Sequence, residues 1–169
     1  MAGRSLPPFA AFLDDHGAPV RRFLVASAGA VEADDLWQET MIAALRAYPD
    51  LRPDSNLRAW VLTIARRKAI DAGRAQARRP VPVAAVEERI AAREPGLGAG
   101  PDVWSAARDL PEGQRHALAL RFAADLSYEE IGAALDCSAA AARRRVADAV
   151  ATLRARLATP TAPEPDHAR

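Results

Sequence analysis

Apolar residues along this chain recur at the spacing of α-helices. Between Glu32 and Tyr48 the spacings are four, four and three, which predicts one helix with an apolar face formed by Trp37, Met41, Leu45 and Tyr48. An earlier apolar set predicts either one opening helix or a pair interrupted at residues 17–19, and consists of Phe9, Phe12, Leu13, Val20, Phe23 and Leu24. The alternation of β-branched residues that is typical of strands is scarce. The sequence therefore predicts an all-α fold.

A third helix is predicted to follow a turn that contains Pro49 and Pro53. Asp54, Ser55 or Asn56 can cap this helix, which begins near Leu57. Its apolar face is predicted to consist of Leu57, Trp60, Val61 and Ile64, beside a polar stripe of Thr63, Arg67 and Arg74. Arginines next to an aromatic residue can hold phosphates while the ring stacks on an unpaired base. For Trp60 the alternative is a place in the core.

The second half of the chain has the pattern of a helix-turn-helix. A helix is predicted from Pro111 to about Ala124-Asp125, with the apolar set Ala117, Leu118, Leu120 and Phe122. Ser127 and Glu130 have capping-box spacing, so a second helix begins there and turns Ile131 and Leu135 inward. After a turn at residues 136–137, Ser138 is a good N-cap for a longer helix. A short helix, a tight turn and a longer helix are typical of major-groove readers.

Proline and glycine divide the chain into two lobes. They cluster in residues 80–101, which predicts a flexible linker with a short helix possible in "AAVEERIAAR". The expected organisation is a helical bundle in residues 1–79, the linker, a helix-turn-helix domain in residues 102–157 and a disordered tail in residues 158–169.

Charge is uneven although the net charge is only +1. Residues 1–50 hold seven acids against four arginines, whereas residues 66–79 hold six basic residues against Asp71 alone. The basic segment is dense enough to attract a polyanion.

Several other classes of function are not expected, because the sequence lacks the residues that they require. Cys137 is the only cysteine, which excludes an internal disulfide and a cysteine-based zinc site and suits the cytoplasm. His16, His116 and His167 are scattered, without a nucleophile, a glycine loop for phosphates or metal-ligand spacing, so neither an enzyme nor a metal or cofactor site is expected. His116 is expected to be half-buried or exposed, and Cys137 to be packed. No apolar run is long enough to cross a membrane.

The arginines of the last helix follow four alanines that are small enough for the backbone to approach DNA. Arg143 and Arg145 diverge by about 200° around the helix, so they cannot both enter one groove. We expect one or two of Arg143, Arg144 and Arg145 to meet phosphates or base edges and the remainder to face solvent.

The chain from Phe9 to Leu157 resembles the extracytoplasmic-function (ECF) sigma factors of bacterial RNA polymerase, which have two helical domains joined by a linker. "DDLWQETMIAAL" resembles the segment that docks on the polymerase clamp. "LRAWVLTIARRKAIDAGRAQARR" is similar to the segment that opens and reads the −10 promoter element, and "LPEGQRHALALRF…LSYEEIGAALDCS" to the domain that reads the −35 element. The resemblance implies three partners: core RNA polymerase, promoter DNA and an anti-sigma protein.

Site residues follow from the resemblance by position. Those implied to bind polymerase are Asp35, Leu36, Gln38 and Glu39. Those implied to bind the −10 element are Asp54, Ser55, Asn56, Trp60, Arg66, Arg67 and Arg74, with residues 54–56 receiving a flipped base. Those expected at the −35 element are Ser138, Ala139, Ala140, Arg143, Arg144 and Arg145.

Four residues depart from the family pattern. Arg67 stands where asparagine is common, Gly73 where a large apolar residue is common, Ala142 where valine is frequent and Asp148 where arginine is frequent. Because an acid repels phosphate, Asp148 predicts a weak, altered or partner-dependent reading of the −35 element. Two alternatives remain: a dimeric helix-turn-helix repressor, which would leave the first lobe without a purpose, and a sigma mimic that binds only an anti-sigma protein, which would not need the basic segment.

Overall fold

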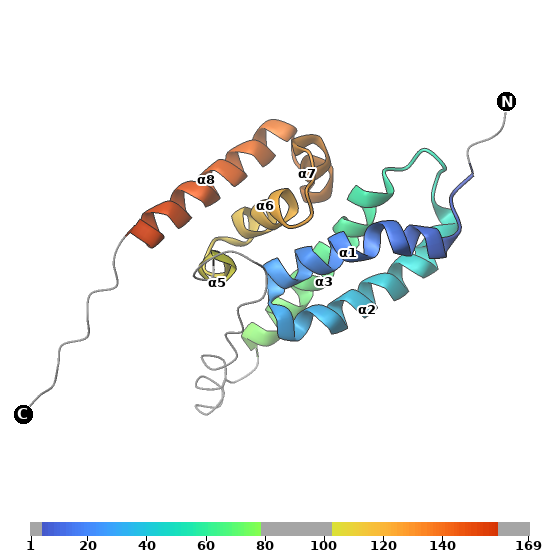
Figure 1. The fold of residues 1–169 in the computed structure, drawn as a ribbon, viewed down its shortest axis with the longest axis horizontal. Helices are drawn as coiled ribbons and strands as arrows, with labels where there is room; N and C mark the ends of the chain where they lie inside the picture. Colours follow the sequence, from blue (N-terminus) through green and yellow to red (C-terminus); the bar gives the residue numbers. More distant parts are fainter. Residues whose placement is uncertain (1–4, 79–102, 159–169) are drawn as a thin grey trace, which may run out of the picture.

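The computed structural model describes residues 5–78 and 103–158, and this part of the chain consists of α-helices, one short 3-10 helix and their connections (Figure 1). The all-α prediction is confirmed. The predicted linker at residues 80–101, its possible short helix and the tail beyond Ala158 lie outside the described residues.

The first lobe contains α1 (Phe9–Ala28), α2 (Ala30–Ala47), the 3-10 helix η1 (Tyr48–Asp50) and α3 (Leu57–Arg78). Of the two possibilities for the opening segment the single helix is correct, since α1 continues through Pro19. The Trp37 Nε1–H of α2 donates to the Gly17 carbonyl at 2.9 Å, which ties the two helices together at this point. Gly29 has a φ of 101°, a conformation that only glycine adopts readily, and so α1 passes into α2 without a loop.

The apolar face predicted for α2 is partly wrong. Leu45 is 53% exposed, whereas the buried residues of the helix are Ala33, Leu36, Thr40, Met41 and Ala44. The reason is angular, because eight residues at 100° each leave Leu45 about 80° away from Trp37. Tyr48 is buried, but it belongs to η1.

Helix α3 begins where the sequence predicts, and Asn56 is its cap. The Asn56 Oδ1 accepts the Ala59 backbone N–H at 3.0 Å. Of the predicted core stripe, Val61 is buried, whereas Leu57, Trp60 and Ile64 are only half-buried. The buried side chains of α3 are Ala59, Val61, Leu62, Ala65 and Ala69.

The second lobe contains α5 (Val103–Arg108), α6 (Glu112–Phe122), α7 (Tyr128–Leu135) and α8 (Ala139–Ala158). Two expectations for α6 are wrong: Phe122 is 60% exposed at its end, and His116 is 1% exposed instead of half-buried or at the surface. Leu120, two residues before Phe122, points inward and is fully buried. The inward positions of Ile131 and Leu135 are confirmed.

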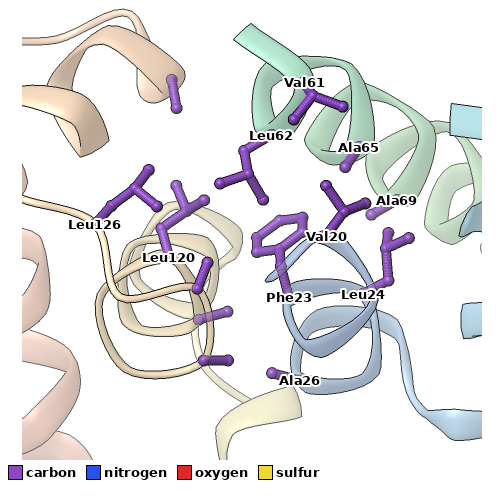
Figure 2. Close-up of a cluster of buried hydrophobic side chains, with 14 of the residues drawn as sticks. Val20, Phe23, Leu24, Ala26, Val61, Leu62, Ala65, Ala69, Leu120 and Leu126 are labelled. Atoms are coloured by element: carbon purple, nitrogen blue, oxygen red, sulfur yellow. The ribbon is translucent and has the colours of Figure 1, made fainter. Parts of the chain in front are cut away.

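The two lobes pack on each other. Figure 2 shows Leu120 and Leu126 of the second lobe facing Phe23 of α1 and Leu62 of α3, and all four side chains are fully buried in one apolar cluster. Figure 1 shows α7 beside the beginning of α3 and α6 beside α1. The core of the molecule therefore continues from one lobe into the other.

Candidate nucleic-acid interface

The N-termini of α7 and α8 are fixed by local hydrogen bonds. Ser127 and Glu130 form the predicted capping box, with the Ser127 N–H donating to Glu130 Oε2 at 2.9 Å and the Glu130 N–H donating to Ser127 Oγ at 3.2 Å. Ser138 Oγ accepts the Ala141 N–H at 3.1 Å, which confirms the second cap. The two caps fix where α7 and α8 begin, and a short helix, a tight turn and a longer helix are the elements of a groove-reading motif.

Glycine is required at one position of α7, opposite the turn that leads to α8. A Cβ on Gly132 would lie 2.6 Å from the Cys137 carbonyl oxygen and 3.2 Å from the Ala139 nitrogen. The backbone of the turn therefore passes directly over α7, and the close approach brings Ser138 and the start of α8 against the preceding helix.

The three arginines of α8 have different surroundings. The Arg143 guanidinium lies over the Tyr128 ring, 4.9 Å from its centroid, and Arg144 forms an exposed ion pair with Asp148 at 3.9 Å. Arg145 is half-buried and its Nη1–H donates to Cys137 Sγ at 3.5 Å. Arg143 and Arg144 are thus exposed for a polyanion, whereas Arg145 packs against its own lobe.

The leading turn of α8 is mostly open to solvent. Ser138 and Ala140 are exposed and Ala139 is half-buried. Ala142 is fully buried and faces the core of the lobe.

The loop before α3 lies at the exposed surface of the first lobe. Asp54 is exposed and pairs with Arg52 at 3.1 Å, and Ser55 is half-buried. Asn56 uses its oxygen for the cap of α3, and its Nδ2–H donates to Glu130 Oε1 of α7 at 3.2 Å.

Trp60 belongs to an aromatic cluster. Its ring is half-buried, 5.8 Å from the Phe12 centroid and 6.3 Å from the Tyr48 centroid. Arg67 and Arg74 are exposed, as their stripe predicts, whereas the Arg66 Nε is buried. Of the three arginines assigned to the −10 element, Arg67 and Arg74 are therefore exposed and Arg66 is half-buried.

The outward face of α2 combines polar and apolar side chains. Asp35, Gln38 and Glu39 are exposed, and Glu39 pairs with Lys68 of α3 at 3.1 Å. Leu36 is 5% exposed and faces the core. The same face holds Ile42 and Leu45, which are 51% and 53% exposed. We call this face the outer stripe of α2: Asp35, Gln38, Glu39, Ile42 and Leu45.

Sequence reasoning missed Ile42 and assigned Leu45 to the core. The signal was present, because residues 35, 38, 42 and 45 follow the i, i+3, i+4 spacing of one helical face. Exposed large apolar residues in a row are typical of a protein-binding surface.

His116 is the buried titratable group at the junction of the lobes. Burial, and after it the Arg115 and Arg66 charges, lower the pKa of His116 from its usual 6.5 to about 3. The ring lies 6.0 Å from the Phe23 ring of α1, and neither ring nitrogen has a hydrogen-bond partner in the described residues. The side chain is therefore neutral and serves as part of the packing.

Within residues 5–78 and 103–158, no group of three or more metal-binding side chains comes together, and no helix is long and apolar enough to span a membrane.

Both lobes match models of known protein families, and most of the chain matches known proteins. The family model of sigma-70 region 2 matches residues 12–79, and that of sigma-70 region 4 matches residues 106–155. ECF RNA polymerase sigma factor EcfG of Rhodopseudomonas palustris is 34% identical over 131 residues, which are 75% of this chain and 72% of that protein. The chain belongs to the ECF sigma factors of the sigma-70 family. As a member of this family, it directs RNA polymerase to promoters.

Other ECF sigma factors resemble this one over most of their length. ECF RNA polymerase sigma factor SigC of Mycobacterium tuberculosis is 34% identical over 151 residues, covering 87% of this chain and 80% of that protein. In the solved complex of the sigma factor RpoE with the anti-sigma factor NepR from Bartonella quintana, the matched chain has a TM-score of 0.69 at 25% identity, over 90% of this chain and 98% of that chain. In the structure of CnrH with the cytosolic domain of CnrY, the corresponding values are 0.68 and 27%, over 90% and 89%.

The candidate binding surfaces of this ECF sigma factor lie in the two matched regions. The outer stripe of α2, the loop of residues 54–56 and α3 all fall within the region 2 match. The region 4 match covers α7 and α8 up to residue 155.

Proposed function

We propose that this sigma factor docks on core RNA polymerase through the outer stripe of α2. The observation that carries the proposal is the exposure of Ile42 and Leu45 beside Asp35, Gln38 and Glu39 on a single helical face. Such a face offers apolar area for affinity and acids for orientation towards a basic partner. Leu36 contributes indirectly, by packing α2 onto its lobe.

Charge reversal on this face tests the proposal. We expect the chain to co-elute with core polymerase in gel filtration and the Asp35→Lys/Glu39→Lys variant to lose at least tenfold in affinity. Asp14→Lys is the matched control, because Asp14 is an exposed acid on α1, away from the outer stripe. Equal binding by all three proteins would contradict docking through α2. Binding to duplex DNA in the absence of any polymerase binding would favour the repressor.

We propose further that residues 1–79 read the −10 element and residues 102–157 read the −35 element. In the first lobe, Asn56 and its loop would receive an unpaired base while Arg67 and Arg74 hold phosphates. Extruding a base costs a few kcal/mol, which the pocket and phosphate contacts would offset. In the second lobe, the residues that would face a groove of duplex DNA are all exposed: Ser138, Ala140, Arg143 and Arg144.

The proposed activity needs no catalytic group of its own, since it consists of binding polymerase and capturing DNA, and it belongs in the cytoplasm with the chromosome. We also propose an anti-sigma partner, because two structures that resemble this chain are complexes with an anti-sigma factor, NepR, and with CnrY. The tagged chain should retain from its own cells a protein that prevents core polymerase from binding, and retention of polymerase alone would contradict this partner.

A further inference from the structure

Tyr128, the first residue of α7, contacts arginines from the two neighbouring helices. The Arg143 guanidinium of α8 lies 4.9 Å from the centroid of the Tyr128 ring, and the Arg121 guanidinium, in the last turn of α6, lies 5.2 Å from it. Separations below about 6 Å place both cations in attractive contact with the ring. One aromatic ring of the second lobe therefore contacts a cation of the helix before it and a cation of the helix after it.

The Tyr128 side chain has a well-supported position. The capping box of Ser127 and Glu130 fixes the first turn of α7, to which Tyr128 belongs. The side chain is half-buried and packs against the main apolar core. The Arg121 Nη1–H donates to the Leu126 carbonyl at 2.8 Å, which ties the end of α6 to the segment before α7. Because its backbone is capped and its side chain is packed, Tyr128 offers the arginines a fixed surface.

The two exposed arginines of α8 differ in how well they are ordered before DNA binds. The Arg144 Nε lies 3.9 Å from Asp148 Oδ2, and these side chains are 86% and 53% exposed, so water weakens and screens the pair. Arg143 instead lies on an aromatic ring that is itself held in place. A side chain that is ordered in advance loses less conformational entropy on binding. Arg143 is therefore the better prepared of the two for a DNA contact of fixed geometry.

Neither guanidinium at the Tyr128 ring pairs with a carboxylate in the part of the chain that the structure describes. The ion pairs of that part involve other basic residues: Arg21, Arg52, Lys68, Arg144 and Arg156. Two like charges at one ring create a positive local potential, which attracts a polyanion. Because Arg143 lies near the start of α8, this potential lies beside the turn that is proposed to enter a groove.

We propose that Tyr128 is a positioning residue for DNA binding, whose ring holds the Arg143 guanidinium in the orientation in which it meets a phosphate of the −35 element. The inference rests on the proposed reading of that element by the second lobe. Tyr128 acts through Arg143 and needs no DNA contact of its own. Phosphate contacts fix the register of a helix on the duplex, so an ordered Arg143 sets which base edges the leading turn of α8 meets.

A double-mutant cycle separates this positioning role from simple packing of the lobe. Tyr128→Leu removes the aromatic face and keeps an apolar side chain, whereas Tyr128→Phe keeps the ring and is the conservative variant. Tyr128→Leu is combined with Arg143→Ala and, as the matched control, with Arg144→Ala, because Arg144 is the adjacent exposed arginine and pairs with Asp148. Thermal unfolding followed by circular dichroism shows that each variant is folded at the temperature of the titrations.

The probe is the duplex that the full-length parent enriches most strongly from a randomised pool of about 30 base pairs, which exceeds the contact of one groove-reading helix. We expect Tyr128→Leu to weaken binding of this duplex about fourfold in the parent and in Arg144→Ala, as for the loss of an exposed cation–π contact. In Arg143→Ala the same substitution should change nothing, because the ring acts only through Arg143. Tyr128→Phe should bind like the parent, since a phenyl face also attracts a guanidinium.

Three results would overturn the positioning role and leave the proposed reading of the −35 element intact. Equal weakening by Tyr128→Leu in the parent and in Arg143→Ala would show that Tyr128 only packs the lobe. Unchanged binding by Tyr128→Leu would show that Arg143 needs no ring, and a loss with Tyr128→Phe as large as that with Tyr128→Leu would show that the hydroxyl is required instead. If the parent enriches no sequence from the pool, the proposed reading of duplex DNA fails and the positioning role falls with it.

Discussion

At the scale of single residues, two glycines differ in the space that surrounds them. A Cβ on Gly132 would come 2.6 Å from a backbone oxygen of the turn before α8, whereas a Cβ on Gly73 would meet nothing within 4 Å on the exposed end of α3. Alanine at Gly132 would therefore collide with the backbone of the turn, whereas alanine at Gly73 would meet open space.

We expect Gly132→Ala to lower the free energy of unfolding by about 1–3 kcal/mol, because the turn must move away from α7. Gly73→Ala should raise it by about 0.5–1 kcal/mol, since alanine restricts the unfolded chain and favours the helix. Urea denaturation followed by circular dichroism measures both. A neutral Gly132→Ala would contradict the close approach.

His116 should make stability depend on pH. Burial lowers its pKa to about 3 in the folded protein, against 6.5 in an unfolded chain. Below pH 6.5 the unfolded chain binds a proton that the folded protein does not, so stability falls as the pH is lowered. Between pH 7 and pH 5 the loss attributable to His116 should be about 2 kcal/mol.

The His116→Leu variant isolates this effect, because leucine fills similar space and does not titrate. Its free energy of unfolding should exceed that of the parent, and the difference should grow from pH 7 to pH 5. A difference that stays constant over this range would show that His116 is not desolvated in the folded protein.

At the scale of elements, the sequence predicted helices better than it predicted their inward faces. Caps at Asn56, Ser127 and Ser138 are local chemistry and are visible in the residues themselves. The inward face of a helix depends on where the neighbouring helices lie, and alanines can form this face as well as large residues can. Leu45 is exposed because Ala44 points inward in its place, and Phe122 is exposed at the end of α6.

The arginines of α8 belong to the same scale, since their roles depend on the helix face. Arg143→Ala and Arg144→Ala should each weaken binding of a duplex DNA probe and reduce its salt slope by about 1, as expected for the loss of one phosphate contact. Arg145→Ala should leave the slope unchanged, because Arg145 contacts Cys137 and is half-buried. Titrations at several salt concentrations decide this, and a lower slope for Arg145→Ala alone would reverse the assignment.

At the scale of the whole molecule, docking of the lobes was beyond sequence reasoning. Phe23 and Leu120 are recognisable as core residues of their own helices, but nothing in their spacing says that they share one core. The contacts that orient the lobes use backbone carbonyls of Ala123 and Ala124 as acceptors, which every residue possesses and no pattern reveals. The outer stripe of α2 and the start of α8 are nevertheless both exposed in the docked molecule.

Transcription by purified core polymerase on fragmented genomic DNA from the organism that makes the protein, with sequencing of the RNA 5′ ends, tests the central claim most directly. With this protein added, we expect discrete start sites preceded by two shared sequence elements about 25 base pairs apart. The Asp35→Lys/Glu39→Lys variant should abolish these sites, and the Asp14→Lys control should retain them. If the parent yields the same scattered 5′ ends as core polymerase alone, the protein does not direct polymerase to promoters.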